Sequence, residues 1–213
     1  NIKIYKGYTV VNTFGYKRVN KISIMQLSKD GQKVVGSKIS IDCDCLGMSG
    51  GWTPAVHLFT QSGGKLKFRD EDQVFIPDTY PSDQISIGSC NGDFTLDEIL
   101  SSISKKLKDF LNIKKTEYEN LEIQSHFNKT KRNIWLLPSD KIIGKTKPFV
   151  DYQNDATAKD IKLALREGFR SIEHVKRYTT TGMGTDQGKL GNMHALGIIS
   201  ETAGSKMGEL GTT

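Results

Sequence analysis

The chain has 213 residues, 36% of them hydrophobic, and a formal net charge of +6. This length allows one large domain or two small ones, and no apolar run has the length of a membrane span or the pattern of a signal peptide. Lysines are scattered and no stripe of arginines and aromatic residues is present, so the composition does not favour nucleic-acid binding. We therefore expect a cytoplasmic protein with no nucleic-acid or membrane partner.

Residues 1–45 alternate between apolar and polar positions, as the strands of a β meander do. Turns are expected near 14–17 and 28–31. The strands are expected around Ile2–Ile4, Tyr8–Val11, Val19–Ile24 and Ser37–Cys45. Such alternation fits many α/β and all-β proteins.

A glycine pair at Gly50 and Gly51, followed by Trp52, ends the next apolar stretch. From the residues alone, a tight turn that needs glycine backbone angles is favoured, with Trp52 covering the edge of a core. Contact between this turn and a cofactor is the alternative. A helix is expected to begin within Ala55–Thr60.

An apolar strand, a loop of small residues and a helix are expected to follow one another over 84–111. Thr95 and Glu98 form a capping box for this amphipathic helix. The expected strands are Gln73–Pro77 and Gln84–Ile87. Such an order presents backbone N–H groups and a positive helix end to a phosphate.

The loop residues Gly88, Asn91 and Gly92 are therefore candidates for cofactor binding. An ordinary turn between strand and helix explains them equally well. The G-x-G-x-x-G fingerprint of dinucleotide-binding Rossmann folds is absent from the sequence.

Residues 112–146 are rich in lysine and asparagine and are expected to connect two domains. Within this connector, Trp135 stands in a short apolar run that ends at Pro138. We predict that Trp135 packs against one of the neighbouring domains.

Residues 157–192 are expected to form two short helices closed by a glycine-rich turn. Thr157 and Asp160 form a capping box, and Gly168 suits the position after a helix end. Helices are expected over Ala158–Glu167, from Ser171 onward, and over Met193–Thr202.

The turn GMGTDQGKLGN holds four glycines in eleven residues, so its backbone must approach something closely. Cations, hydroxyls and glycine-freed amides surround it, which suits a flavin phosphate. The alternative is a solvated helix end beside a loop that has lost an older cluster site. The candidate flavin-binding residues are Lys176, Arg177, Thr179, Thr180 and Lys189.

The residues that usually carry catalysis or bind metals form no recognisable constellation. The three cysteines, Cys43, Cys45 and Cys90, form no even disulfide framework. We interpret Cys43 and Cys45, which lie in an apolar strand-like run, as small buried thiols in a reducing compartment, with a metal or redox pair as the alternative. The four histidines lack metal-ligand spacing, and Ser49 is not in a G-x-S-x-G elbow. We predict no catalytic residue and no metal ligand in this chain.

Two stretches resemble a known family, the alpha subunits of heterotetrameric sarcosine oxidases. They are IKLALREGFRSIEHVKRYTTTGMGTDQGK and SGGWTPAVHLFTQSGGKLKF. The resemblance covers most of the chain, is strongest over 46–66 and 147–192, and is weak over 112–146. It favours cofactor contact for Gly50, Gly51 and Trp52.

The helical part also resembles the [2Fe-2S] ferredoxin-like domains of bacterioferritin-associated ferredoxin and of amine and opine dehydrogenase subunits. In these relatives, cysteines stand where this chain has Asp151, Gln153, Asp186 and Gly191. Because a cluster needs thiolate ligands, the resemblance implies a domain without an iron–sulfur cluster.

For the fold, the resemblance implies α/β: the C-terminal part of a two-dinucleotide-binding flavoprotein-type domain, with a β meander and βα units, followed by a small all-α domain. The chain, which begins with Asn, is expected to be a piece of a longer polypeptide. The expected parts are 1–111 as a partial FAD/NAD(P)-binding-like domain, 112–146 as connector, 147–205 as the helical domain, and 206–213 as the lead-in to a missing aminomethyltransferase-like domain.

For function, the resemblance implies part of the alpha subunit of an oxidoreductase that acts on CH–NH donors and oxidatively demethylates sarcosine, forming peroxide. NAD and FMN shared with the beta subunit would be cofactors, with FAD on the beta subunit. Partners would be the beta, gamma and delta subunits and, through the missing domain, tetrahydrofolate. This fragment alone would not be active.

Two alternatives stay open. One is the alpha subunit of a related dehydrogenase acting on proline, opines or an N-methyl amine. The other is a non-catalytic interaction module that binds a partner through the lysine-rich region.

Overall fold

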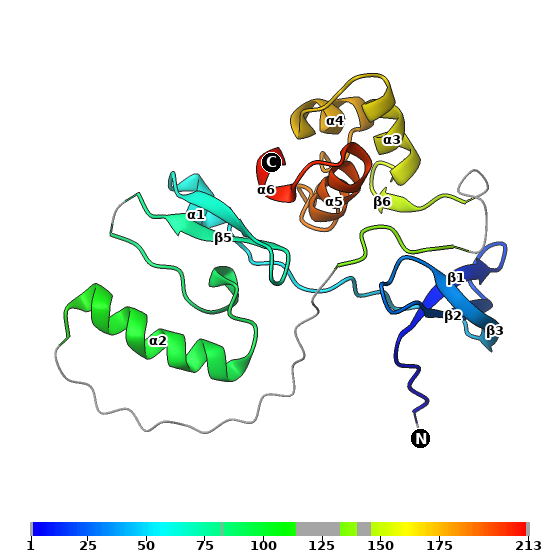
Figure 1. Ribbon diagram of the computed structural model, residues 1–213, viewed down its shortest axis with the longest axis horizontal. Coiled ribbons are helices and arrows are strands. Elements are labelled where there is room, and N and C mark those ends of the chain that lie inside the picture. The colour runs from blue at the N-terminus through cyan, green and yellow to red at the C-terminus, as the bar shows by residue number, and fades with distance from the viewer. Residues whose placement is uncertain (1, 82, 114–132, 140–145, 212–213) are drawn as a thin grey trace. The chain divides into compact units, whose positions relative to one another are not determined.

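The computed structural model describes residues 2–81, 83–113, 133–139 and 146–211 (Figure 1). The chain divides into two compact units: Asn1–Met48 with Ile134–Thr213, and Ser49–Asn133. Most of the expected connector 112–146 lies outside the described residues, and its role stays a prediction, as do the other expected domain boundaries.

The first unit contains a three-stranded antiparallel sheet with the order β1-β2-β3, which confirms the expected meander. The central strand buries Ile22 and Ile24, and Val11 is buried beside them. The strands are β1 (Tyr8–Phe14), β2 (Lys21–Leu27) and β3 (Val34–Asp42).

The strand expected at Ile2–Ile4 is wrong, because the described residues there have no strand structure. Ile2 is 92% exposed and Ile4 is 75% exposed, so the alternating apolar side chains find no surface to cover. A strand of this kind is stabilised by packing on one face, and the pattern alone does not supply that face.

The same unit carries the helical part, whose core is formed by Ile161, Val175, Ile198 and Ile199. Its elements are β6 (Phe149–Asp151), β7 (Ala156–Thr157), α3 (Ala158–Arg166), α4 (Ile172–Thr179), α5 (Asn192–Ala203) and α6 (Met207–Leu210). The three expected helices are confirmed: α3 and α5 agree with expectation within one residue at each end, and α4 begins one residue after Ser171. The part expected to be all-α also contains the short β6–β7 hairpin, which is a correction.

Trp135 packs against α5, which belongs to the same compact unit. The packing expected for Trp135 is therefore observed, and its interpretation as contact with a neighbouring domain stays a prediction. Its ring meets His194 edge-on, with ring centroids 6.1 Å apart. A Cβ at Gly197 would overlap the indole, so glycine at this buried helix position makes room for Trp135. Burial lowers the pKa of His194, and a backbone hydrogen bond at Leu190 opposes that shift.

The second unit pairs two strands and carries an amphipathic helix. Phe68 and Phe75 meet edge-on at 5.1 Å between centroids, and Val74 and Ile76 are buried. Its elements are α1 (His57–Gln61), β4 (Lys65–Arg69), β5 (Val74–Thr79), the 3-10 helix η1 (Gly88–Asn91) and α2 (Leu96–Leu111). The expected helix start within Ala55–Thr60 and the expected Gln73–Pro77 strand are confirmed in outline.

The strand expected at Gln84–Ile87 is wrong, since the described residues there adopt no regular structure. Side chains donate hydrogen bonds to the backbone carbonyl groups that would otherwise pair with a neighbouring strand. Lys106 Nζ donates to Ser86 O at 3.0 Å, and Cys90 Sγ donates to Ile87 O at 3.0 Å. None of the helices in the described ranges is both long and apolar enough to cross a bilayer.

We predict that Gly197→Ala lowers the melting temperature of the chain. The added methyl group displaces the indole of Trp135, and overpacking of this kind costs about 1–3 kcal/mol. Intrinsic fluorescence of Trp135 in a Trp52→Phe background should shift to longer wavelength. Gly47→Ala is the control, because a Cβ there meets nothing within 4 Å. Equal stability of the two variants would contradict the packing described for Trp135.

Candidate functional site

The glycine-rich loop singled out by the sequence is hydrogen-bonded to the tip of the β6–β7 hairpin. Asp151 Oδ2 accepts the Gly182 N–H at 2.7 Å. Gln153 Oε1 accepts the Thr185 N–H at 2.6 Å and its hydroxyl at 2.8 Å. Two polar side chains of one short hairpin therefore hold two successive parts of the loop.

A third polar side chain, the carboxylate of Asp186, organises the far end of the loop. Asp186 accepts the N–H groups of Gly188 and Leu190, each at 3.2 Å. Because these bonds connect residues two and four positions apart, they close the loop on itself before α5 begins.

Side chains of the chain itself explain why the loop contains so much glycine. A Cβ at Gly182 or Gly188 would overlap the amide of Asn192, and one at Gly184 would overlap the amide of Gln153. The close approach predicted for this backbone is confirmed. The groups that it approaches are two amide side chains at the start of α5 and on the hairpin.

These residues do not fit the ligand set of a [2Fe-2S] cluster. Of the four positions that carry cysteine in the resembled ferredoxin-like domains, Asp151, Gln153 and Asp186 use their oxygens to accept loop N–H groups. The fourth, Gly191, has no side chain, and a Cβ there would lie 2.7 Å from Val150 O. In the part of the chain that the structure describes, no three His, Cys, Asp or Glu side chains gather in a way that could hold a metal ion.

Asp151 is only 6% exposed, and the charge of its carboxylate is stabilised by hydrogen bonds. Burial by itself raises its pKa, but N–H donors from Gly182, Asn154 and Gln153 outweigh that effect. The net pKa of Asp151 therefore lies below its ordinary value.

Three threonines link α4 to the loop. The hydroxyls of Thr179 and Thr181 are 2.7 Å apart and buried, and Thr179 also donates to Val175 O at 2.8 Å. Thr180 between them is exposed and left-handed, with φ of 58°, and its carbonyl accepts the Asn154 side chain at 3.1 Å. A β-branched residue rarely adopts this backbone conformation.

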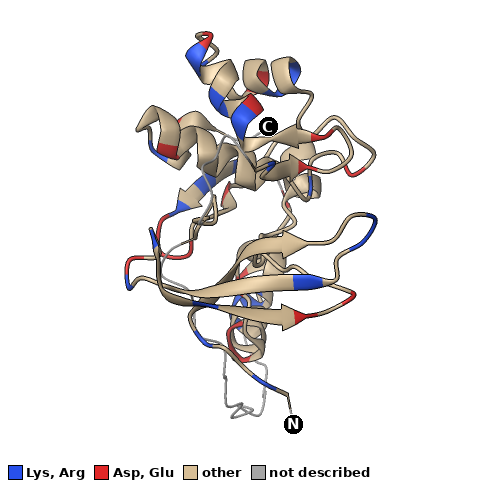
Figure 2. Cartoon of the chain, turned by 90° about the vertical axis from the view of Figure 1, so that its right-hand side faces the viewer, with Lys and Arg blue, Asp and Glu red and all other residues tan. Residues whose placement is uncertain are grey.

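The predicted flavin-binding residues differ in the solvent exposure of their side chains. Arg177, Thr180 and Lys189 are exposed, and Lys176 is half-buried in the last turn of α4. The hydroxyl of Thr179 is used inside the protein. Basic and acidic residues are interspersed over the helices and strands in view, rather than gathered in one stripe (Figure 2).

Gly50, Gly51 and Trp52 lie in an exposed connection between β3 and α1. Gly51 has φ of 125°, an angle that favours glycine, and a Cβ there would meet nothing within 4 Å. Trp52 is 75% exposed, so it does not cover the edge of a core here. Their contact with a cofactor stays a prediction.

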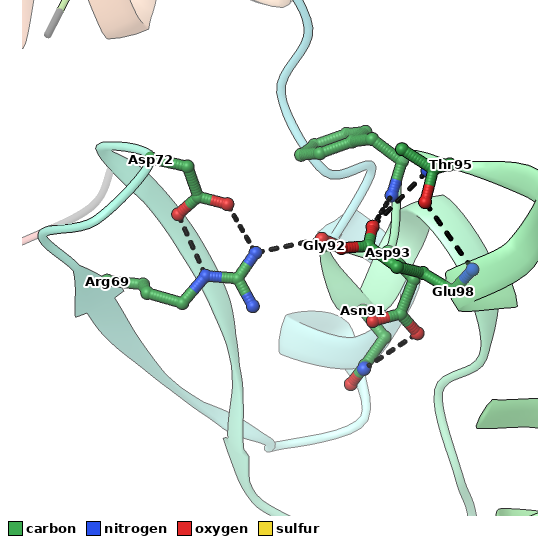
Figure 3. A network of polar contacts seen from close by, with 8 residues as sticks. Arg69, Asp72, Asn91, Gly92, Asp93, Thr95 and Glu98 are labelled. Atoms are coloured by element: carbon green, nitrogen blue, oxygen red, sulfur yellow. Dashed lines mark hydrogen bonds and ion pairs between the residues drawn. The ribbon is translucent and has the colours of Figure 1, made fainter. Parts of the chain in front are cut away.

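Gly88, Asn91 and Gly92 form the turn before α2. Arg69 pairs with Asp72, and its Nη2 donates to Gly92 O at 2.8 Å (Figure 3). This pairing with Asp72 raises the pKa of the guanidinium, against the effect of burial. A Cβ at Gly92 would lie 2.7 Å from that nitrogen, so the absence of a side chain at Gly92 allows the Arg69 guanidinium to contact the turn.

The start of α2 is closed by its own cap. The Glu98 carboxylate accepts the N–H groups of Phe94 and Thr95, both at 3.3 Å, and Thr95 Oγ1 accepts the Glu98 N–H at 3.4 Å (Figure 3). Asn91 donates to Asp93 at 3.2 Å. These donors serve the turn itself, and binding of a phosphate here stays a prediction.

Sequence reasoning missed Asn154, Asn192 and the Arg69–Asp72 pair. A packing role for the Asn192 side chain could have been suspected, because Asn192 directly follows a loop with four glycines. The space that the missing glycine side chains leave must be filled by another group. Arg69 and Asp72 flank a turn three residues apart, but only recognition of the β4–β5 hairpin would have paired them.

Comparison with known proteins identifies what this chain is similar to. Residues 145–213 match the family described as the sarcosine oxidase A3 domain. The chain is 33% identical to the sarcosine oxidase subunit alpha of Rhizobium meliloti (strain 1021), a match that covers 84% of this chain and 18% of the relative. It is 29% identical to that of Corynebacterium sp. (strain P-1), over 100% of this chain and 22% of the relative. The resemblance to sarcosine oxidase alpha subunits is confirmed.

The chain thus spans about a fifth of the length of these curated relatives, with 18% and 22% of the two covered. Among solved structures, the L-proline dehydrogenase from P. horikoshii is similar in fold, with a TM-score of 0.56 and 18% identity. That match covers 96% of this chain and 41% of the other. The shared fold confirms a mixed α/β architecture with small sheets and helices.

Replacing Thr180 by glycine should stabilise the protein. Glycine adopts the left-handed conformation without the steric cost of about 1–2 kcal/mol that an L-residue bears there. We expect a gain of about 1 kcal/mol in the free energy of unfolding, measured by urea titration. Thr60→Gly, at an exposed position in α1, is the control and should lose about 1 kcal/mol. A loss in both variants would show that Thr180 is unstrained.

Asp151→Asn should weaken the loop and change how stability depends on pH. Because the folded pKa of Asp151 is depressed, its contribution is fully present above the unfolded value of about 3.9 and is lost as pH falls through the folded pKa. Urea midpoints across pH 2.5–6 should show a flatter profile in the variant and, at pH 6, a loss of about 2 kcal/mol.

The exposed Asp155→Asn, on the same hairpin, is the matched control and should stay within about 0.5 kcal/mol of the parent. A pH profile unchanged by Asp151→Asn would contradict the assigned hydrogen bonds.

Proposed function

Because this chain is similar to sarcosine oxidase alpha subunits over most of its length, we propose that it is part of the alpha subunit of a sarcosine oxidase-like flavoenzyme. The complete complex oxidises a CH–NH donor. Sarcosine loses two electrons and two protons to form an imine, and hydrolysis of the imine by one water releases glycine and formaldehyde. Oxygen takes up two electrons and two protons and leaves as peroxide. A bound flavin would supply the means of passing electrons between the two half-reactions.

The observation that carries this proposal is the match of residues 145–213 to the sarcosine oxidase A3 domain. The loop geometry supports it, because the loop is shaped by carboxylate and amide side chains and needs no cluster. The loop is held by its hydrogen bonds to Asp151 and Gln153, while Thr180 beside it is exposed. The surface around Thr180 is therefore accessible to a ligand.

Within that complex, we propose that the exposed side chains of Arg177, Thr180 and Lys189, with half-buried Lys176, contact FMN shared with the beta subunit. Cations and a hydroxyl are suitable partners for a phosphate. The Gly182 and Thr185 N–H groups are engaged by the hairpin, so side chains would supply most of these contacts. Thr179 would support the site from inside by holding the end of α4.

Residues 1–111 are proposed to be part of a dinucleotide-binding domain that takes NAD. The fold shared with a proline dehydrogenase chain supports a domain of the two-dinucleotide-binding flavoprotein type. The proposed contacts are Gly50, Gly51, Trp52, Gly88, Asn91 and Gly92. Of these residues, Trp52 has the largest side chain, and it is 75% exposed.

The remaining partners follow from the same proposal. FAD would be held by the beta subunit, gamma and delta subunits would complete a cytoplasmic heterotetramer, and tetrahydrofolate would bind an aminomethyltransferase-like domain elsewhere in the polypeptide. This chain would contribute cofactor contacts and no catalytic residue.

The test uses the full-length protein purified together with its partner subunits. We expect flavin absorbance, less than stoichiometric iron, and peroxide formed from sarcosine faster than from proline. Lys189→Gln with Arg177→Gln should weaken FMN retention about tenfold, equivalent to about 1.4 kcal/mol. Lys65→Gln, an exposed lysine on β4, is the control. A complex without flavin, or one that oxidises only proline, would overturn the proposal.

A further inference from the structure

Three large apolar side chains around the glycine-rich loop are exposed. Tyr152 is 70% exposed, Met183 is 52% exposed and Leu190 is 73% exposed. Single exposed apolar residues are common on protein surfaces and need no explanation. These three differ because they stand on backbone segments that meet at one point.

That meeting point is Asp151. Tyr152 follows Asp151 directly, and Met183 follows Gly182, whose N–H donates to the Asp151 carboxylate at 2.7 Å. Leu190 precedes Gly191, where a Cβ would lie 2.7 Å from Val150 O and 3.9 Å from the Asp151 Cα. The three side chains therefore arise from adjoining backbone positions, although they are up to 38 positions apart in the sequence.

The backbone beneath these side chains is already ordered. Gln153, next to Tyr152, holds the N–H of Thr185 at 2.6 Å, and Asp186 holds the N–H of Leu190 at 3.2 Å. The ring centroids of Phe149 and Tyr152 are 6.0 Å apart, so the tyrosine has an aromatic neighbour on its own hairpin. Apolar groups on a fixed frame lose less entropy on binding than groups on a free loop, as a docking surface requires.

The charges that accompany these segments are mainly positive. Lys147 precedes the hairpin, Arg177 precedes the loop, and Lys189 is adjacent to Leu190, and all three are exposed. On the acidic side, Asp155 is exposed, whereas the Asp186 carboxylate accepts two loop N–H groups. An apolar centre with a basic rim complements an apolar patch bordered by carboxylates.

We propose that Tyr152, Met183 and Leu190 form a docking face for another protein subunit, one that presents an apolar patch bordered by Asp and Glu side chains. The inference rests on the proposed function, in that the chain is part of a multi-subunit enzyme. It goes beyond that function by assigning the apolar centre of the contact to side chains outside the proposed FMN set, although Arg177 and Lys189 of the basic rim belong to both. Exposed tyrosine, methionine and leucine on a rigid frame suit the centre of a protein interface.

The test uses the full-length protein, purified separately and mixed with its purified partner subunits. Tyr152→Ser with Leu190→Ser should raise the Kd of assembly about 100-fold, since each removes an apolar anchor. Tyr16→Ser with Leu58→Ser is the matched control, because these side chains are 99% and 81% exposed at other places. Tyr152→Phe with Leu190→Met should assemble normally, and melting temperatures should be equal in all variants.

The basic rim adds a second measurement. Lys147→Glu should weaken assembly, and the difference from the unmodified protein should shrink as sodium chloride is raised, because salt screens exposed charges.

Each outcome bears on the inference differently. Equal assembly of the Tyr152/Leu190 variant and its control would overturn it. Normal assembly with lowered FMN content would show that the face binds flavin, which also overturns it but leaves the proposed function intact. If the unmodified protein binds no partner subunit, both the inference and the proposed function fail.

Discussion

The carboxylate of Asp151 is the group on which the glycine-rich loop of this molecule depends for its position. It is buried, accepts hydrogen bonds from both its own hairpin and the distant loop, and is charged without a cation beside it among its described partners. Backbone N–H groups supply the stabilisation that a buried carboxylate requires. The carboxylate thereby fixes the path of the loop. The positions of the exposed loop side chains, among them Met183, Lys189 and Leu190, follow from that path.

This arrangement explains how such a domain keeps its shape without a metal cluster. In an iron–sulfur protein, thiolate ligands and N–H bonds to sulfur would organise the loop. Here the side-chain oxygens of Asp151, Gln153 and Asp186 accept hydrogen bonds from the loop N–H groups. The amide of Asn192 fills the space beside two of the loop glycines. Polar side chains of the chain itself thus hold the loop in place.

The sequence predicted those elements whose signals are local. Helices α2 and α3 each begin with a capping box, whose two residues are three positions apart, and carry an apolar face with helical period. Both helices were therefore found with nearly correct ends. Strands β4, β6 and β7 were missed and the strand at 84–87 was wrong, because a strand of a few residues exists only if a partner accepts its hydrogen bonds. The loop was recognised by its glycines, and the positions of Asp151, Gln153 and Asp186 were found only through resemblance to cysteine-bearing relatives.

By itself, then, the sequence determined the helical scaffold, the presence of a closely packed glycine loop and the family that the chain resembles. These depend on residue type and on spacings of three or four positions. Only the tertiary structure decided what the glycines approach, which hydroxyls are internal, and which exposed side chains meet around Asp151. The reason is physical: hydrogen bonds such as that from Gly182 to Asp151, between residues 31 positions apart, depend on how the hairpin and helices pack and leave no periodic trace in the chain.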